Sequence, residues 1–260
     1  MKKYWSIFLT QIINNLAYPG ELFWRSTIII IFMWIFSSLW RVTYSVTDAA
    51  ATGLSLRDTM WYFMLAETIE LSKPRLAAAI SSAVKDGSIA YLLNKPFNFL
   101  LYQFSSGMGD SIVRALMNLL LGTVTVWLLV GPPPGIFGWL LAIPTVLLSW
   151  SLHYCFNALV GLAAFLAEEV APYEWIYQKF VQVLGGLFIP LDFFPSWLKT
   201  FAMALPFASM LYGPARLFVK PTWTDFFSLI GIQVFWLLIM GIVLALAYRK
   251  SVTYLTVNGG

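Results

Sequence analysis

Long apolar runs dominate the chain, and short polar segments separate them. A helix needs about 20 apolar residues to cross a bilayer, and five runs reach that length. A sixth, weaker run carries Glu67 and Glu70 three residues apart, on one helical face. The pattern predicts an all-α membrane protein with six transmembrane helices. These predicted spans are residues 22–41, 58–72, 104–130, 137–167, 175–194 and 226–248.

The beginning of the chain has a different pattern, in which apolar residues occupy one side of a helix. Trp5, Phe8 and Leu9 illustrate the i, i+3, i+4 spacing of that face, and polar residues fall on the other side. This stretch is too amphipathic to span a bilayer, and a Pro-Gly turn at residues 19–20 ends it. We therefore expect residues 1–20 to form a helix that lies in the membrane interface.

Residues 73–98 form the most polar internal segment of the chain. Ser72 is positioned to cap a helix with Pro74 in its first turn, and Gly87 is expected to break that helix. Pro96 closes the segment. We expect a short, ordered, basic element on the cytoplasmic side. Its charged residues are Lys73, Arg75, Lys85, Asp86 and Lys95.

Glycine and proline residues indicate where other apolar stretches break or pack closely. Residues 195–221 contain Pro206 and Pro214, so we expect two short helical pieces that dip into the outer leaflet and return. Two glycines and a proline within residues 185–190 predict a kink or close packing in the fifth span. Gly241, four residues before an alanine, predicts a close helix contact in the last span.

The amino-acid composition also indicates a membrane protein. Hydrophobic residues make up 60% of the chain and charged residues 11%, and mean hydropathy is +0.77. Lipid must therefore cover most of the surface. The net charge of +4 is small, and no dense basic patch suggests nucleic-acid binding. The length suits a single transmembrane domain over residues 1–260.

The distribution of positive charge predicts the orientation. If the chain begins in the cytoplasm and crosses six times, the cytoplasmic side receives twice as many Lys and Arg residues near span ends and in loops as the outer side. Such a bias favours this orientation. We expect a multi-pass protein of the cytoplasmic (inner) membrane of a prokaryote, with both termini in the cytoplasm.

Few residues suit catalysis or metal binding. The chain has one histidine, His153, and one cysteine, Cys155, and it lacks the G-x-x-x-x-G-K-[ST] pattern of a phosphate-binding loop. We therefore expect no catalytic site, no metal and no cofactor in this chain. Some charged residues within the spans are candidates for an intramembrane polar path. They are Glu67, Glu70, Asp110 and Arg114.

Several local sequences occur in an order that resembles the type-2 ATP-binding-cassette (ABC) exporter permeases. An interfacial helix, six spans, a polar helical loop after the second span and a re-entrant segment before the sixth share that resemblance. The matching sequences are VKDGSI at 84–89, LLNKP at 92–96, GGLFIPL at 185–191, FFP at 193–195, LPFAS at 205–209, YRK at 248–250 and the terminal GG at 259–260.

The resemblance implies a role and partners for particular segments. It implies a permease that pairs with a second permease, identical or related, and with two ABC ATPase subunits that bind ATP and magnesium. It also assigns two groups of residues. The ATPase-coupling group is Arg75, Lys85, Asp86, Gly87, Ile89, Leu93, Lys95 and Pro96, and the outer re-entrant group is Pro195, Trp197, Pro206, Phe207, Tyr212 and Pro214.

Two other functions remain open at this stage. A proton- or ion-coupled carrier working alone would use the charged residues within the spans, although no internal repeat is visible. A membrane-embedded enzyme or assembly factor is a third hypothesis, and the shortage of His, Cys and clustered carboxylates argues against an enzyme. The sequence does not identify a cargo, because aromatic residues also serve membrane interfaces and packing.

Overall fold

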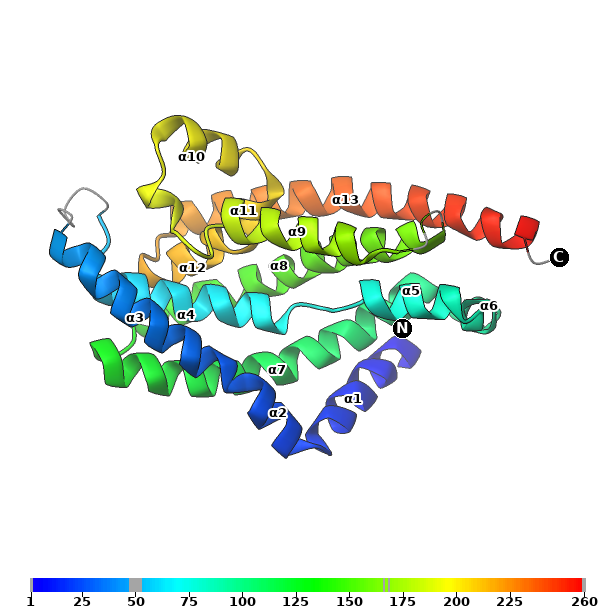
Figure 1. Cartoon of the computed structure of the whole chain (residues 1–260), viewed down its shortest axis with the longest axis horizontal. Coiled ribbons are helices and arrows are strands. Elements are labelled where there is room, and N and C mark those ends of the chain that lie inside the picture. Colours follow the sequence, from blue (N-terminus) through cyan, green and yellow to red (C-terminus); the bar gives the residue numbers. More distant parts are fainter. Residues whose placement is uncertain (1, 47–52, 166, 168, 259–260) are drawn as a thin grey trace.

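The computed structural model describes residues 2–46, 53–165, 167 and 169–258. Helices account for the regular structure in these ranges (Figure 1). The elements are α1 (Lys2–Leu16), α2 (Pro19–Ser26), α3 (Ile28–Val46), α4 (Leu56–Ser72), α5 (Ala77–Lys85), α6 (Ser88–Leu93), α7 (Phe99–Val130), α8 (Ile136–Leu162), η2 (Ala163–Phe165), α9 (Ala171–Leu184), η3 (Leu191–Phe193), α10 (Ser196–Met203), α11 (Pro206–Met210), α12 (Tyr212–Val219) and α13 (Trp223–Asn258).

Four helical stretches of the described chain are long and apolar enough to cross a membrane. They overlap the predicted spans 22–41, 104–130, 137–167 and 226–248. The all-α class is thereby confirmed, whereas the full set of six spans stays a prediction, because α4 and α9 are shorter. The four stretches are Pro19–Val46, Phe99–Val130, Ile136–Phe165 and Trp223–Thr253.

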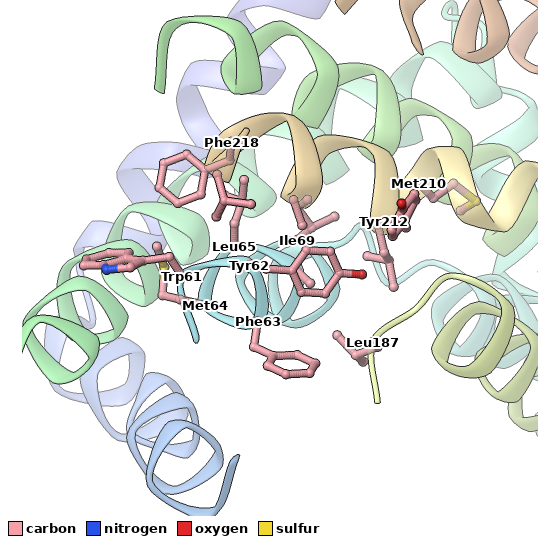
Figure 2. Close-up of a cluster of buried hydrophobic side chains, with 14 of the residues drawn as sticks. Trp61, Tyr62, Phe63, Met64, Leu65, Ile69, Leu187, Met210, Tyr212 and Phe218 are labelled. Atoms are coloured by element: carbon pink, nitrogen blue, oxygen red, sulfur yellow. The ribbon is translucent and has the colours of Figure 1, made fainter. Parts of the chain in front are cut away.

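Helix α4 is the centre of the bundle. Every residue from Thr59 to Glu70 is buried, and Figure 2 shows side chains leaving this helix on all sides. Phe63 stacks on Phe36 of α3 with ring centroids 4.7 Å apart, whereas Trp61 meets Phe218 of α12 edge to face. A helix enclosed in this way needs no amphipathic periodicity, because protein covers its whole circumference.

The predicted fifth span, residues 175–194, is a shorter helix than expected. Helix α9 ends at Leu184, and residues 185–190 leave the helical path. Gly186 adopts a φ of +78°, which favours glycine. The Tyr62 hydroxyl donates a hydrogen bond to the Gly186 carbonyl at 2.7 Å. The predicted kink is therefore a helix end, held by a contact with α4.

Residues 195–221 form three short helices, α10 to α12, so the prediction of two pieces was wrong. Leu205 adopts an extended conformation before Pro206, and Leu211 interrupts the helical path again before Tyr212. Helices α11 and α12 are largely buried, and α12 packs against α4 and α8. Helices α11 and α12 are therefore packed against protein, as non-spanning apolar helices require, whereas α10 is largely exposed.

Both ends of the described chain and two short helices lie at one end of the bundle. The start of α1, helices α5 and α6, and the end of α13 lie at this end, whereas α10 and the α7–α8 connection lie toward the other (Figure 1). Helix α1 packs along α7, where a Cβ at Gly109 would lie 2.6 Å from the Phe8 carbonyl oxygen. The predicted interfacial helix is thus attached to the bundle by close backbone contact.

The structure does not contain the close contact predicted at Gly241. A Cβ at that position would meet no atom of the described chain within 4 Å. Gly138 of α8 makes the close approach instead, because a Cβ there would lie 2.1 Å from the Phe218 carbonyl oxygen of α12. Glycine at 138 therefore lets α12 lie directly on α8.

These two glycines give a matched pair of stability variants. Gly138→Ala is expected to lower the thermal unfolding temperature, because its methyl group would collide with backbone that cannot rotate away. Gly241→Ala is expected to leave that temperature unchanged or raise it, because alanine favours a helix by about 0.5–1 kcal/mol over glycine. Thermal unfolding of both purified variants in one detergent checks this, and equal effects would contradict the α8–α12 contact.

Candidate functional site

The segment 73–98 begins with an extended stretch. The prediction that Ser72 caps a following helix was wrong. Ser72 is the last residue of α4, and its hydroxyl accepts a hydrogen bond from Asn118 of α7 at 3.0 Å. Pro74 lies in a non-helical linker, and α5 begins at Ala77. The hydroxyl was thus engaged by a residue distant in sequence, which spacing alone does not reveal.

The turn between α5 and α6 has the predicted glycine break. Gly87 adopts a φ of +75°, with no neighbouring atom within 4 Å of a Cβ built there. The carboxylate of Asp86 accepts a hydrogen bond from the Ser88 backbone N–H at 2.9 Å. Hydrogen bonds from Ser88 hold the pKa of Asp86 below its usual value, because they stabilise the carboxylate. Asp86 therefore orders the turn that starts α6.

An apolar cluster fixes α5 and α6 to the long helices. Ile80 and Ile89 are each 1% exposed, and they belong to a cluster with Tyr154 and Ala158 of α8 and Leu244 of α13. Ile89 is therefore an anchor of the segment and is not accessible to a partner protein.

The approach between α5 and α8 is close enough to depend on a glycine. A Cβ at Gly161 of α8 would lie 3.0 Å from side-chain atoms of Ile80 and 3.2 Å from the Ala77 Cα. Such contact leaves little room for α5 to slide on α8. The two helices should therefore move together.

The opposite side of the segment is exposed. Lys85, Asp86, Gly87 and Ser88 lie on it, and Tyr91 is 69% exposed. Lys85 forms an ion pair with Glu169 at 2.7 Å. A groove of 500 Å³ runs between α5 and the start of α9 beside this pair. The surface thus offers charge, an aromatic ring and a concavity within a small area.

The remaining residues of the predicted coupling group differ in their exposure and in the contacts that they make. Arg75 is exposed and donates to the Leu71 carbonyl at 3.3 Å. The Lys95 ammonium lies 4.5 Å from the Tyr91 ring centroid, and the Pro96 carbonyl accepts a hydrogen bond from the Lys3 ammonium at 2.9 Å. Helix α1 therefore holds the end of the segment. Leu93 ends α6, but its side chain lies outside the described part of the structure.

The four predicted charged residues of the spans lie around the end of α4. Glu67 and Glu70 are 2% and 7% exposed, and they face protein and a cavity, as their cost in lipid predicts. Glu70 forms an ion pair with Lys73, a residue that sequence reasoning placed in the cytoplasmic loop. Its i, i+3 spacing from Glu70 was the available signal.

Arg114 caps the end of α4. It forms the predicted pair with Asp110 on α7, and its guanidinium also donates to the carbonyls of Leu71 and Lys73, each at 3.0 Å. These carbonyls belong to the end of α4, where intrahelical donors are lacking. The Asp110–Arg114 pair therefore has a structural role at the junction between α4 and the linker.

The outer segment is organised around a residue that sequence reasoning missed. Asp192 of η3 pairs with Lys199 at 2.9 Å and with Arg216 at 3.3 Å, and it accepts a hydrogen bond from the Tyr212 hydroxyl at 3.0 Å. Its side chain is 5% exposed. It is the one Asp or Glu between residues 175 and 224, which was a usable signal.

The other predicted residues of the outer segment divide between surface and interior. Pro195 precedes α10, and Trp197 on that helix is 70% exposed. Pro206 and Pro214 are buried at the start of α11 and inside α12. Phe207 stacks against Phe180 of α9 with ring centroids 5.9 Å apart. The structure therefore brings Phe207 and Tyr212 into the bundle and leaves Trp197 outside.

Within the described residues, no three His, Cys, Asp or Glu side chains lie close enough together to hold a metal ion.

Family comparison agrees with this architecture. Residues 22–259 match the family described as ABC-2 family transporter protein, and a comparison with curated proteins gives no match. The chain belongs to the ABC-2 transporter family, as a multi-pass membrane permease subunit. Membership in this family implies association with ABC ATPase subunits.

The anchoring cluster leads to a stability prediction. Ile80→Ala is expected to destabilise the protein by about 2–5 kcal/mol, because it removes a buried side chain from the α5–α8 contact. Tyr91→Ala removes an exposed ring and is expected to leave stability nearly unchanged. Denaturation of both variants under the same conditions checks the pair, and an unaffected Ile80→Ala protein would show that α5 is not anchored.

Proposed function

We propose that this chain is the permease subunit of an ATP-driven exporter. Two permeases, identical or related, would form the translocation path between them, and each would bind a separate ABC ATPase. ATP and magnesium would be bound by those ATPases and not by this chain. Family membership supports the permease role, and the observation that carries the coupling assignment is the exposed, ordered surface of α5 and α6.

The anchoring of that surface explains how it would transmit force. Helix α5 is packed on α8 through Ile80 and Gly161. A partner that displaced α5 would therefore move α8 and, through the linker at Lys73, the end of α4. A flexible loop would absorb the same displacement. The residues exposed for contact are Arg75, Lys85, Asp86, Gly87, Ser88, Tyr91 and Pro96.

Helices α10 to α12 lie away from α5 and α6 along the bundle (Figure 1), and the Asp192 interactions hold them together. In an exporter this segment would close the outer end of the path until cargo is released. The chain would sit in a prokaryotic inner membrane with both termini and α5–α6 in the cytoplasm.

A stand-alone ion-coupled carrier receives less support. Members of this family are membrane transport subunits, and the Asp110–Arg114 pair serves the α4 end. Proton-driven uptake by the purified chain in liposomes, without nucleotide or another protein, would favour the carrier instead.

Charge reversal at the coupling surface tests the ATPase assignment. The double variant Lys85→Glu, Lys95→Glu is expected to reduce co-purification of the ATPase in mild detergent, because a basic surface becomes acidic. Arg57→Glu reverses a charge at an exposed position beside the α7–α8 connection, toward the other end of the bundle, and is expected to leave co-purification unchanged. Quantitative mass spectrometry of the purified complex measures this. Equal ATPase recovery from the double variant would contradict the docking assignment.

Cysteine labelling tests the orientation. In a Cys155→Ser background, Ser88→Cys is expected to react with a membrane-impermeant maleimide only after cells are permeabilised. Trp197→Cys, an exposed position on α10, is expected to react in intact cells. Labelling of Ser88→Cys in intact cells would place α5 and α6 outside and would remove the proposed ATPase contact.

A further inference from the structure

A cavity of 310 Å³ lies between α3, the second half of α4 and α9. Its buried floor contains Glu67, Glu70 and Lys73, whereas Glu174 and Gln178 form a partly exposed rim. Apolar walls complete the cavity. They are Phe32 of α3, Leu71 of α4, and Leu187 and Phe188 after α9. This mixture of a polar floor and apolar walls is typical of small-molecule sites.

The floor of the cavity holds carboxyl groups that the protein leaves incompletely paired. Glu67 is 2% exposed, and its carboxylate accepts no hydrogen bond from the described residues. Glu70 uses one oxygen for Lys73, and its other oxygen is buried without a hydrogen-bond partner in the same ranges. Burial of an unpaired carboxylate is unfavourable. A ligand that supplied positive charge here would remove that cost.

The charge balance of the lining points the same way. Three acidic side chains (Glu67, Glu70 and Glu174) and two basic ones (Lys73 and Arg75) line the cavity, so acidic groups outnumber basic groups by one. Lys73 is occupied by Glu70, and Arg75 donates to the Leu71 carbonyl. Neither lining cation therefore forms an ion pair with Glu67, and Phe32 and Phe188 add aromatic rings, which attract cations.

We propose that this cavity binds the positively charged group of a lipophilic ligand, with Glu67 as its counter-ion. The proposal rests on the permease function, because it makes the cargo an amphipathic cation. The apolar part of the ligand would lie against Phe32, Leu187 and Phe188. Glu70 and Lys73 would shape the floor, and Glu174 would attract the cation at the rim.

Equilibrium binding to the full-length chain in phosphatidylcholine nanodiscs tests the proposal. The probe is radiolabelled tetraphenylphosphonium, whose charge does not titrate, and the matched probe is tetraphenylborate, an anion of the same shape. After subtraction of empty nanodiscs, saturable binding is expected for the cation and not for the anion. Lack of saturable cation binding, or equal binding of both ions, would overturn the proposal.

Neutral variants then locate the binding charge. Glu67→Gln is expected to weaken cation binding about tenfold, because the nearest counter-charge is lost. Glu21→Gln alters an exposed carboxylate that pairs with Arg25 outside the cavity, and it is expected to bind as wild type does. Unchanged binding by Glu67→Gln would also overturn the proposal. If that variant does not fold, Glu174→Gln at the partly exposed rim decides, with weaker binding expected and wild-type binding contradicting the site.

The two proposals can fail separately. Recovery of an ATPase with the chain, together with absent cation binding, would leave the permease function intact and remove the cation assignment. Cation binding to Glu67, together with no ATPase in the purified complex, would leave the binding site and remove the proposed coupling.

Discussion

The end of α4 is the constraint on which the rest of the arrangement depends. A helix that ends inside an apolar bundle leaves carbonyl groups that lipid cannot satisfy. Arg114 satisfies those of Leu71 and Lys73, and Asp110 balances its charge. The carboxylate of Glu70 does the same for the Lys73 ammonium. Because these charges compensate one another, the chain can leave α4 in an extended linker and begin α5 separately.

The linker makes two parts of the molecule interdependent. Lys73 lies on the floor of the acidic cavity, and it is also the residue at which α4 gives way to the linker toward α5. Helix α5 in turn contacts α8 at Gly161. A displacement applied to α5 and α6 would therefore reach the cavity through a short, densely packed route, with few intervening residues able to absorb it.

Sequence reasoning succeeded where a property is local and failed where it depends on distant partners. The long apolar spans and the break at Gly87 follow from hydropathy and backbone geometry alone. Ser72 was misassigned as a cap because Asn118, far along the chain, engages its hydroxyl. Asp192 stands out in the sequence as a lone acidic residue, but its partners Tyr212 and Arg216 are brought to it only by the fold. The candidate cavity combines residues from α3, α4 and α9, so local spacing could reveal only the Glu67–Glu70 and Glu70–Lys73 pairs.

Buried polar contacts also explain why the bundle has a unique arrangement despite its apolar composition. Lipid solvates apolar side chains about as well as another helix does, so apolar area alone distinguishes packings poorly. Gln233 of α13 donates to the carbonyls of Thr145 and Ser209 at 3.0 and 2.8 Å, and thereby joins α8 and α11 to the last helix. Tyr62 joins α4 to the loop after α9 at Gly186. Such directional bonds select the positions of the short helices, and the cavity beside Glu67 exists because α9 is held at that place.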